Sequence, residues 1–197
     1  MSRVEKVLRD LSDAFTTQRQ RFALVGGLAV SARAEPRFTR DVDVAVAAAD
    51  DSVAEMLVYQ LVNLGYVVLM AVEQDAAKRL ATVRMLPPRQ SRQSVVADLL
   101  FASSGIEDRL VDSAEAIEIL PGFTVPVATV GHLLALKVLS LAPDRPQDLM
   151  DIRSLLAVAS PSDLDDAREA LALIDERGFS RGKALLDELQ RLALGFP

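Results

Sequence analysis

The sequence predicts a mixed α/β domain over residues 1–128, followed by a helical domain over residues 129–197. Up to residue 128, apolar segments of strand length alternate with amphipathic segments and are separated by Gly, Pro and Asp. From Thr129 onward, apolar residues recur at helical spacing. A length of 197 residues suits one domain or a core with a small appendage.

The first elements follow directly from the apolar pattern. Apolar residues from Val4 to Phe15 recur every three or four positions, which predicts an amphipathic helix over residues 3–20. Residues 22–25 are a short apolar segment followed by Gly26 and Gly27, so we expect a strand that ends in a turn. One or two helical turns over residues 28–33 are expected after those glycines.

A loop and a strand come next. Pro36 restricts the residue before it to extended backbone, so residues 35–40 are predicted to form a loop. In residues 41–46, Val alternates strictly with Asp or Ala, which predicts a strand with Val42, Val44 and Val46 on one face. The sequence Asp50-Asp51-Ser52 predicts the start of a helix that continues to about Leu64 and ends at Gly65.

The remaining elements follow from the same two periodicities. Proline residues 87 and 88 separate two apolar segments, and Pro143 ends the first helix of the C-terminal part. Thr129 is the expected N-cap of that helix, and His132 in its first turn is expected to cap or pack. The predicted elements are strands 66–72, 80–86 and 94–101, short strands and turns over 114–128, and helices 130–142, 146–158, 162–175 and 180–193.

The composition excludes several kinds of site. The chain has no Cys and one His, so disulfide scaffolds, thiolate metal sites, cysteine nucleophiles and multi-histidine zinc sites are ruled out. The N-terminal residues are charged and the longest apolar stretch is interrupted by His132 and Lys137, so we expect a soluble, cytoplasmic protein. Carboxylate, lysine, arginine and hydroxyl chemistry remain.

Charge is distributed unevenly along the chain, although the net charge is −6. Residues 1–40 carry eight basic and four acidic side chains, and residues 78–109 carry six basic and three acidic ones. Residues 41–77 carry seven acidic side chains and no basic one. A basic surface beside an acidic one suits a metal site next to a phosphate-binding surface, and uneven surface charge without function is the alternative.

Three aspartates are candidate metal ligands. Asp41 and Asp43 lie on the same face of a predicted strand, with Cβ atoms about 6–7 Å apart. Carboxylates at that distance can converge on Mg²⁺ together with substrate phosphates. Asp98 lies within the apolar segment 95–101, where an unpaired carboxylate is costly, so it is a candidate third ligand. The alternative is that Asp41 caps a turn and Asp98 lies at a strand edge.

The two glycines also have a chemical interpretation. A Gly26-Gly27 turn between a strand and a helix allows the backbone N–H groups to approach a triphosphate closely, although a turn without function is the alternative. Arg37 and Arg40 flank the carboxylates and are candidates to hold phosphates. Thr39 either caps the turn or contacts the triphosphate, and we consider it as a site of regulatory phosphorylation.

The order of these residues resembles the polymerase-β-like nucleotidyltransferase superfamily, and within it the AbiEii/MenT toxins of bacterial toxin–antitoxin systems. Arg37, Thr39, Asp41 and Asp43 match the Arg-x-Thr-x-Asp-x-Asp pattern of that branch. Lys137 and the segment 145–152, which contains Asp148 and Asp151, resemble a second motif in its helical half. The resemblance implies a nucleotidyltransferase core with a small mixed sheet and a C-terminal helical domain.

The resemblance also implies roles for the residues of the second motif. Lys137 interrupts an apolar helix, where it either reaches solvent or presents its ammonium to the triphosphate. Asp148 is expected to orient Lys137 or to act as a base, and Asp151 is expected to be structural as an N-terminal helix charge. We expect Lys137 and Asp148 to be functional.

The function implied is Mg²⁺-dependent transfer of a nucleotidyl group from a nucleoside triphosphate to the 3′ end of tRNA. That modification would block aminoacylation and translation, and a cognate antitoxin would restrain the toxin. The basic segments 1–40 and 78–109 are candidate contacts to the acceptor stem. The alternatives are transfer to a small molecule, as in aminoglycoside nucleotidyltransferases, transfer to a protein, and a non-catalytic nucleotide-binding protein.

Overall fold

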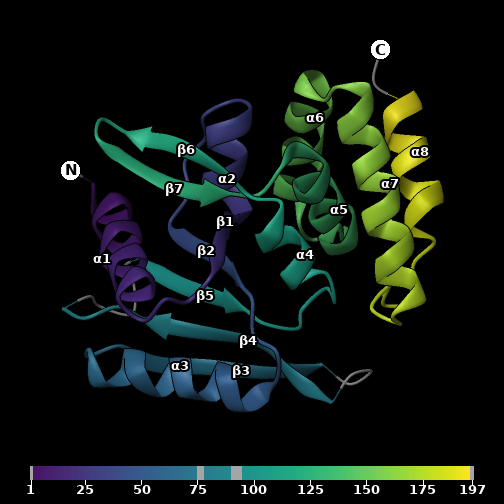
Figure 1. The fold of residues 1–197 in the computed structure, drawn as a ribbon. Helices are drawn as coiled ribbons and strands as arrows, with labels where there is room; N and C mark the ends of the chain where they lie inside the picture. The colour runs from purple at the N-terminus through teal and green to yellow at the C-terminus, as the bar shows by residue number, and fades with distance from the viewer. Residues whose placement is uncertain (1, 75–77, 90–94, 196–197) are drawn as a thin grey trace.

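A computed structural model describes residues 2–74, 78–89 and 95–195 of the chain. Seven strands form one mixed sheet, and helices cover it and extend it (Figure 1). The helices and strands are, in order, α1 Arg3–Thr17, β1 Phe22–Val25, α2 Gly26–Arg33, β2 Asp41–Val46, α3 Asp51–Asn63, β3 Val67–Gln74, β4 Arg79–Leu86, β5 Val96–Leu100, α4 Glu107–Asp112, β6 Glu115–Leu120, β7 Phe123–Val127, α5 Val130–Ser140, α6 Pro146–Val158, α7 Pro161–Glu176 and α8 Leu185–Leu194.

The sheet has the strand order β3-β4-β5-β2-β1-β7-β6. Its centre is formed by β2, which pairs antiparallel with β1 and parallel with β5. Strand β4 pairs antiparallel with both β3 and β5, and β7 joins β1 in parallel and β6 in antiparallel orientation. The predicted mixed α/β architecture is confirmed.

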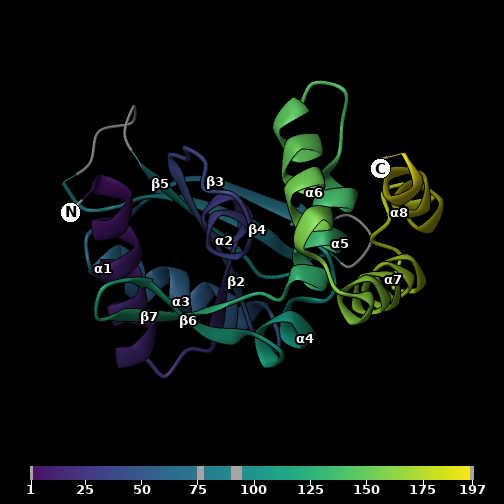
Figure 2. The ribbon, with the colours of Figure 1, turned by 90° about the horizontal axis from the view of Figure 1, so that it is seen from above.

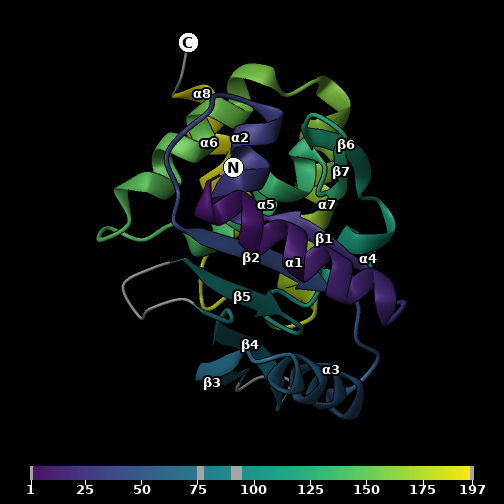
Figure 3. The same ribbon diagram turned by 90° about the vertical axis from the view of Figure 1, so that its left-hand side faces the viewer.

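The helices are arranged around the sheet so that α2 lies between α1 and the C-terminal helices (Figures 1 and 2). Helix α1 crosses β2, and α3 packs on β4 (Figure 3). Helix α2 contacts both α5 and α6, which links the sheet to the C-terminal helices. One hydrophobic cluster extends through both parts and contains Val44 and Leu99 of the sheet with Leu133 and Ile152 of the helices.

The boundaries of α1, α2 and α8 differ from the predictions. Helix α1 ends at Thr17 because Arg19 adopts a left-handed backbone conformation, with φ 54°. Helix α2 begins at Gly26 itself, two residues before the predicted start. Helix α8 begins at Leu185, not at 180, because Arg181 and Gly182 both have positive φ angles and interrupt the helix.

Helix α4 was not predicted. The Glu107 carboxylate accepts hydrogen bonds from the backbone N–H groups of Ser103 and Ser104, at 2.8 and 2.7 Å, and fixes the turn that precedes the helix. The Ser-x-x-Glu spacing of residues 104–107 is the sequence signal for this turn. At the start of α5, Thr129 is the N-cap, as expected, and His132 is buried with its Nδ1 2.8 Å from the Thr129 hydroxyl.

One sheet edge is unusually apolar. Strand β3 is the end strand among the strands that the structure describes, and most of its side chains are exposed. Large apolar side chains are exposed on β3 and on the neighbouring helix α3, namely Val53, Met56, Tyr59, Val62, Val67, Val68, Met70 and Val72. No helix within the described ranges is both long and apolar enough to cross a bilayer. The predicted strand residue 94, the polar residues 90–93 after the proline pair, and the chain end 196–197 lie outside the described residues.

Candidate active site

Three charged side chains form a row across the sheet. Asp43 on β2 is paired in register with Asp98 on β5, and Asp98 is paired with Arg84 on β4. Side chains opposite one another on adjacent strands are close, so this register brings the two carboxylates together. Asp41 lies two residues before Asp43 on the same strand and is therefore on the same face. The predicted acidic residues are thus assembled at one place in the sheet.

Asp98 is neutralised by an arginine that the sequence analysis missed. Arg84 donates from Nε to Asp98 Oδ1 at 2.8 Å and from Nη2 to Oδ2 at 2.6 Å. This bidentate pairing explains how a carboxylate is accommodated within an apolar strand. Alternation along the strand marks Arg84 as a polar residue between Val83 and Met85, but only the register of β4 on β5 places it opposite Asp98.

Glycine at position 26 allows Asp43 to reach the start of α2. Gly26 has a φ angle of +63°, and a Cβ atom added there would lie 1.9 Å from Asp43 Oδ2. A Cβ atom added at Gly27 would lie 2.5 Å from Arg37 Nη2. Both glycines therefore leave space for a charged side chain at the N-terminus of a helix, where backbone N–H groups favour anions.

The carboxylates of β2 have perturbed proton affinities. Burial, followed by the negative charges of Asp98 and Asp41, raises the pKa of Asp43 to about 7. Burial also raises the pKa of Asp41, with Asp98 adding to the effect and Arg84 opposing it. A shift of this kind in a carboxylate pair is typical of sites that bind a cation or move a proton.

The three predicted ligands Asp41, Asp43 and Asp98 are carboxylates, the oxygen donors that a divalent cation such as Mg²⁺ prefers. Asp41 and Asp43 are acidic, close and mutually repulsive, and a divalent cation with oxygen preference would relieve that repulsion. Asp98 accepts one hydrogen bond from Arg84 on each oxygen, which leaves a second lone pair on each oxygen for a cation. Within the described part of the chain, no group of three or more carboxylate or imidazole side chains is placed to hold a metal ion.

Lys137 is held inside the protein by two aspartates of α6. Its side chain is 10% exposed, and its Nζ lies 2.8 Å from Asp148 Oδ1 and 2.7 Å from Asp151 Oδ2. The other oxygen of Asp148, Oδ2, lies 2.8 Å from Arg145 Nε. Lys137 therefore does not extend to solvent, and the spacing of Asp148 and Asp151 along α6 places both carboxylates on the same ammonium.

Asp151 has a different position from the one expected. It lies beyond the first turn of α6, so it is not an N-terminal helix charge; Asp148 is the acidic residue of that turn. Asp151 accepts hydrogen bonds from Arg37 Nε at 2.5 Å and Nη2 at 2.8 Å. Although burial raises its proton affinity, the hydrogen bonds from Arg37 and Lys137 hold the pKa of Asp151 below its ordinary value.

The loop before β2 is fixed to this ion-pair network through Arg37. Ser31 Oγ on α2 accepts a hydrogen bond from the backbone N–H of Arg37 at 3.1 Å. Thr39 Oγ1 accepts one from the backbone N–H of Asp41 at 3.4 Å, which agrees with a turn-capping role. Arg40 is exposed, and its guanidinium carbon lies 5.6 Å from the centre of the Phe38 ring.

A cavity of about 190 Å³ connects the sheet side with the helical side of this site. Gly26 and Asp43 line it from the sheet, and Lys137 lines it from α5. Arg145, the first residue of the second motif, also lines the cavity, together with Arg181, Ser103 and Ser104, and the last three were not expected from the sequence. Arg181 was missed because it belongs to a turn that the sequence analysis assigned to a helix.

Comparison with known proteins supports this description. The family described as the nucleotidyl transferase AbiEii toxin of type IV toxin–antitoxin systems matches residues 7–194. A search of curated protein sequences found no match.

Two solved structures share the fold. ANT(2")-Ia in complex with adenylyl-2"-tobramycin has a TM-score of 0.57 at 13% identity, covering 87% of this chain and 97% of that one. An antigenic nucleotidyltransferase-like protein from Paracoccidioides brasiliensis has a TM-score of 0.53 at 18% identity, covering 95% and 92%.

The MenT4 nucleotidyltransferase toxin from Mycobacterium tuberculosis H37Rv matches with a TM-score of 0.40 at 16% identity, covering 94% of this chain and 91% of that one. The sheet and helices thus agree with the nucleotidyltransferase fold, and the family match covers nearly the whole chain. The chain belongs to the AbiEii family of nucleotidyltransferase toxins, and it is a nucleotidyltransferase.

Proposed function

We propose that this toxin transfers a nucleotidyl group from a nucleoside triphosphate to the 3′ end of tRNA, with Mg²⁺ as cofactor. The observation that supports it best is that Asp43, Gly26 and Lys137 line one cavity from two sides of the protein. An acidic strand, a helix N-terminus and a buried ammonium are together the groups that a metal–triphosphate complex requires.

The proposed step joins the acceptor hydroxyl oxygen to the α-phosphorus and breaks the bond between the α-phosphorus and the bridging oxygen, so that pyrophosphate leaves and the hydroxyl proton is released to water. Asp41 and Asp43 would hold the cation, which neutralises phosphate charge. The N–H groups at the start of α2 would bind phosphate oxygens. Lys137 would neutralise the charge that develops on the leaving pyrophosphate.

For Asp148, the geometry supports the orienting role over the base role. Its Oδ1 accepts the hydrogen bond from Lys137, and Arg145 lies against Oδ2. With cations against both of its oxygens, Asp148 has its carboxylate engaged in holding Lys137. Asp148 therefore fixes the ammonium of Lys137 in place.

Gly27 and Arg37 would act together, because the glycine leaves the space in which the Arg37 side chain holds the loop. Arg40 is exposed and would be the cation that contacts the acceptor phosphates.

The experiment is transfer of label from each nucleoside triphosphate to total tRNA in the presence of Mg²⁺. We expect label in the tRNA band with wild-type protein and a loss of at least about 100-fold with Asp41→Ala, since removal of a ligand for a catalytic metal removes the charge stabilisation of the transition state. Asp10→Asn, a surface change in α1, is the matched control and should retain full activity.

The outcome separates the proposals. Labelling of tRNA that is lost when EDTA is added, and lost again with Asp41→Ala, would support both tRNA as the acceptor and a metal ion as the cofactor. Binding of the triphosphate without labelled RNA would rule out tRNA as acceptor. The proposed restraint is tested by co-expressing the cognate antitoxin in the cytoplasm, where the proposed substrates are. A loss of tRNA labelling in its presence would support it.

A small-molecule acceptor is the second candidate. ANT(2")-Ia shares the fold and was solved with an adenylylated aminoglycoside. The acidic charge of residues 41–77 suits a cationic acceptor. Transfer of label from the triphosphate to an aminoglycoside in the same assay, with tRNA left unlabelled, would favour this candidate.

A further inference from the structure

Phe38 is an exposed aromatic side chain next to the acidic strand. It is 80% exposed, the highest value among the large apolar side chains of the described residues. It is three residues before Asp41, so its Cα lies within about 11 Å of the Asp41 Cα. An aromatic ring left in water at that position contributes little to the core, and a ligand that covers it would gain apolar contact.

The backbone on both sides of Phe38 is anchored. Arg37 is tied to Asp151 on α6 and to Ser31 on α2, and its Nη1 donates to the Phe38 carbonyl oxygen at 3.2 Å. Thr39 bonds to the backbone of Asp41 on the other side. The backbone that carries the ring is therefore anchored, and an anchored loop loses little entropy when a ligand binds to it.

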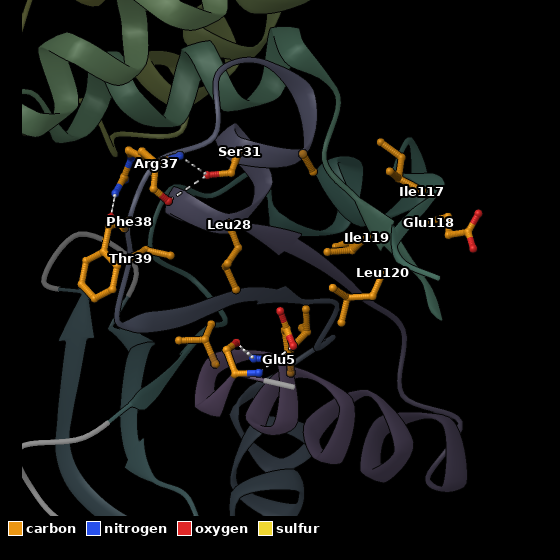
Figure 4. Close-up of a pocket in the computed structure, with 14 residues that line it drawn as sticks. Glu5, Leu28, Ser31, Arg37, Phe38, Thr39, Ile117, Glu118, Ile119 and Leu120 are labelled. Atoms are coloured by element: carbon orange, nitrogen blue, oxygen red, sulfur yellow. Dashed lines mark hydrogen bonds between the residues drawn. The ribbon is translucent and has the colours of Figure 1, made fainter. Parts of the chain in front are cut away.

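The surroundings of Phe38 suit a flat, electron-rich ligand attached to phosphate. The Arg40 guanidinium lies over the ring, 5.6 Å from its centre, and supplies positive charge beside it. A cavity of about 540 Å³ is lined by Arg37, Phe38 and Thr39 together with Leu28 of α2 (Figure 4). Figure 4 shows the Phe38 ring at the rim of this pocket, beside Thr39.

We propose that Phe38 and Arg40 form a stacking platform for a nucleobase beside the acidic strand β2. The inference rests on the proposed nucleotidyl transfer and extends it by assigning base contact to these two residues. Stacking on an aromatic ring with an adjacent arginine is how proteins bind single-stranded nucleic acid with little sequence preference. The base comes either from the acceptor strand or from the nucleoside triphosphate, and the experiment separates the two.

The chain contains no Trp, which makes a direct test available. Phe38→Trp creates a single-tryptophan protein whose fluorescence reports stacking at this position. Tyr59→Trp, at a position on α3 that is 63% exposed, is the matched control. Each variant is titrated with a short single-stranded RNA, with the same RNA lacking bases, and with a nucleoside triphosphate.

We expect the base-containing ligand to quench the tryptophan at position 38 and to leave the one at position 59 unchanged. Quenching by the RNA identifies the acceptor base as the ligand, and quenching by the triphosphate alone identifies the donor base. Equal quenching by the RNA lacking bases, or in both variants, would overturn the platform, because backbone charge alone would then account for it.

A second set of variants tests the ring without a fluorophore. Phe38→Ala and Phe38→Leu should each weaken binding of the base-containing ligand about tenfold, whereas Phe38→Tyr should stay within about threefold of wild type. A Leu variant that binds as well as wild type would show that apolar contact suffices and would refute stacking. Unchanged tRNA labelling and ligand binding by Phe38→Ala would overturn the platform and leave the transferase proposal intact. Base-dependent quenching of the tryptophan at position 38 without any labelled tRNA would support the platform and contradict the proposal that tRNA is the acceptor.

Discussion

Asp43 is the residue whose proton affinity departs most clearly within the acidic group. Burial and the charges of Asp98 and Asp41 raise its pKa from 3.8 to about 7. A carboxylate with a raised pKa in the folded state is protonated more readily there than in the unfolded chain, so folding stability falls as pH rises from about 4 to about 7. The metal-free protein therefore carries a cost at neutral pH that is absent in mild acid.

Asp43→Asn removes that cost. In EDTA at pH 8 we expect the variant to be more stable than wild type by about 1–2 kcal/mol, a value reduced from the full shift because the side chain retains some solvent contact. At pH 4 the two proteins should have the same stability. Urea unfolding at both pH values checks this, and a variant that is less stable at pH 8 would contradict it.

Asp151 has the opposite electrostatic character, because it holds two cations in the interior. Asp151→Asn leaves Arg37 and Lys137 without a common carboxylate and should destabilise the fold by about 3–5 kcal/mol. Its lowered pKa makes this contribution complete above the unfolded pKa and lost as pH falls through the folded value, so the difference should shrink in acid.

Chemical unfolding at pH 7 and pH 3 measures that difference. Asp10→Asn, which breaks the half-exposed ion pair with Lys6, is the control and should change stability by no more than about 1 kcal/mol. If the two variants were equally stable, the ion-pair network around Asp151 would have no structural importance.

At the scale of elements, the start of α2 depends on a glycine. Gly26→Ala places a Cβ atom against Asp43 and also puts a non-glycine residue at a φ angle of +63°. Gly122, in the turn between β6 and β7, has a φ angle of +71° and open space around its Cα. Alanine at position 26 and alanine at position 122 therefore have the same cost in backbone strain, but only alanine at position 26 also collides with Asp43 of β2.

Gly122→Ala should cost about 1–2 kcal/mol, from backbone strain alone, and keep full transferase activity. Gly26→Ala should cost more and abolish metal-dependent activity, because Asp43 has to move. Thermal unfolding together with the labelling assay distinguishes the two effects. Equal activity of both variants would show that the approach of Asp43 to α2 is unimportant.

Much of the element pattern could be predicted because it is local. The strand of Asp41 and Asp43 follows from alternation within six residues, and the start of α3 follows from the Asp50 cap. Helix α4 was missed because it has six residues and its start is fixed by a buried Glu107, whose burial a single sequence does not show.

The ion pairs of the site were harder to predict than its residue types. Arg37 and Asp151 are 114 positions apart in sequence, and only the packing of α2 on α6 brings them together. Arg84 and Asp98 meet through strand register, which depends on how β4 and β5 are joined. The Arg-x-Thr-x-Asp-x-Asp pattern indicated the chemistry, whereas the pairing of charges required the tertiary structure.

For the whole molecule, we propose that the division at residues 128 and 129 separates two structural units that are not independent. Leu133 and Leu139 of α5 belong to the same hydrophobic cluster as Val44 and Leu99. We expect a fragment of residues 1–128 to expose that surface and to lack a cooperative thermal transition, which calorimetry would detect. A cooperative transition close to that of the full chain would show that the sheet domain folds alone.

The apolar end strand β3 has a consequence for how the protein behaves in concentrated solution. Among the described residues, no strand pairs with the outer edge of the eight-residue strand β3, and with Val68, Met70 and Val72 exposed this edge is a template on which strands from other molecules can add. We expect purified protein to form larger particles as its concentration rises, and Met70→Lys to suppress them with transferase activity unchanged. Light scattering over a concentration series measures this. The exposed edge therefore limits the concentration at which the toxin stays monomeric in solution.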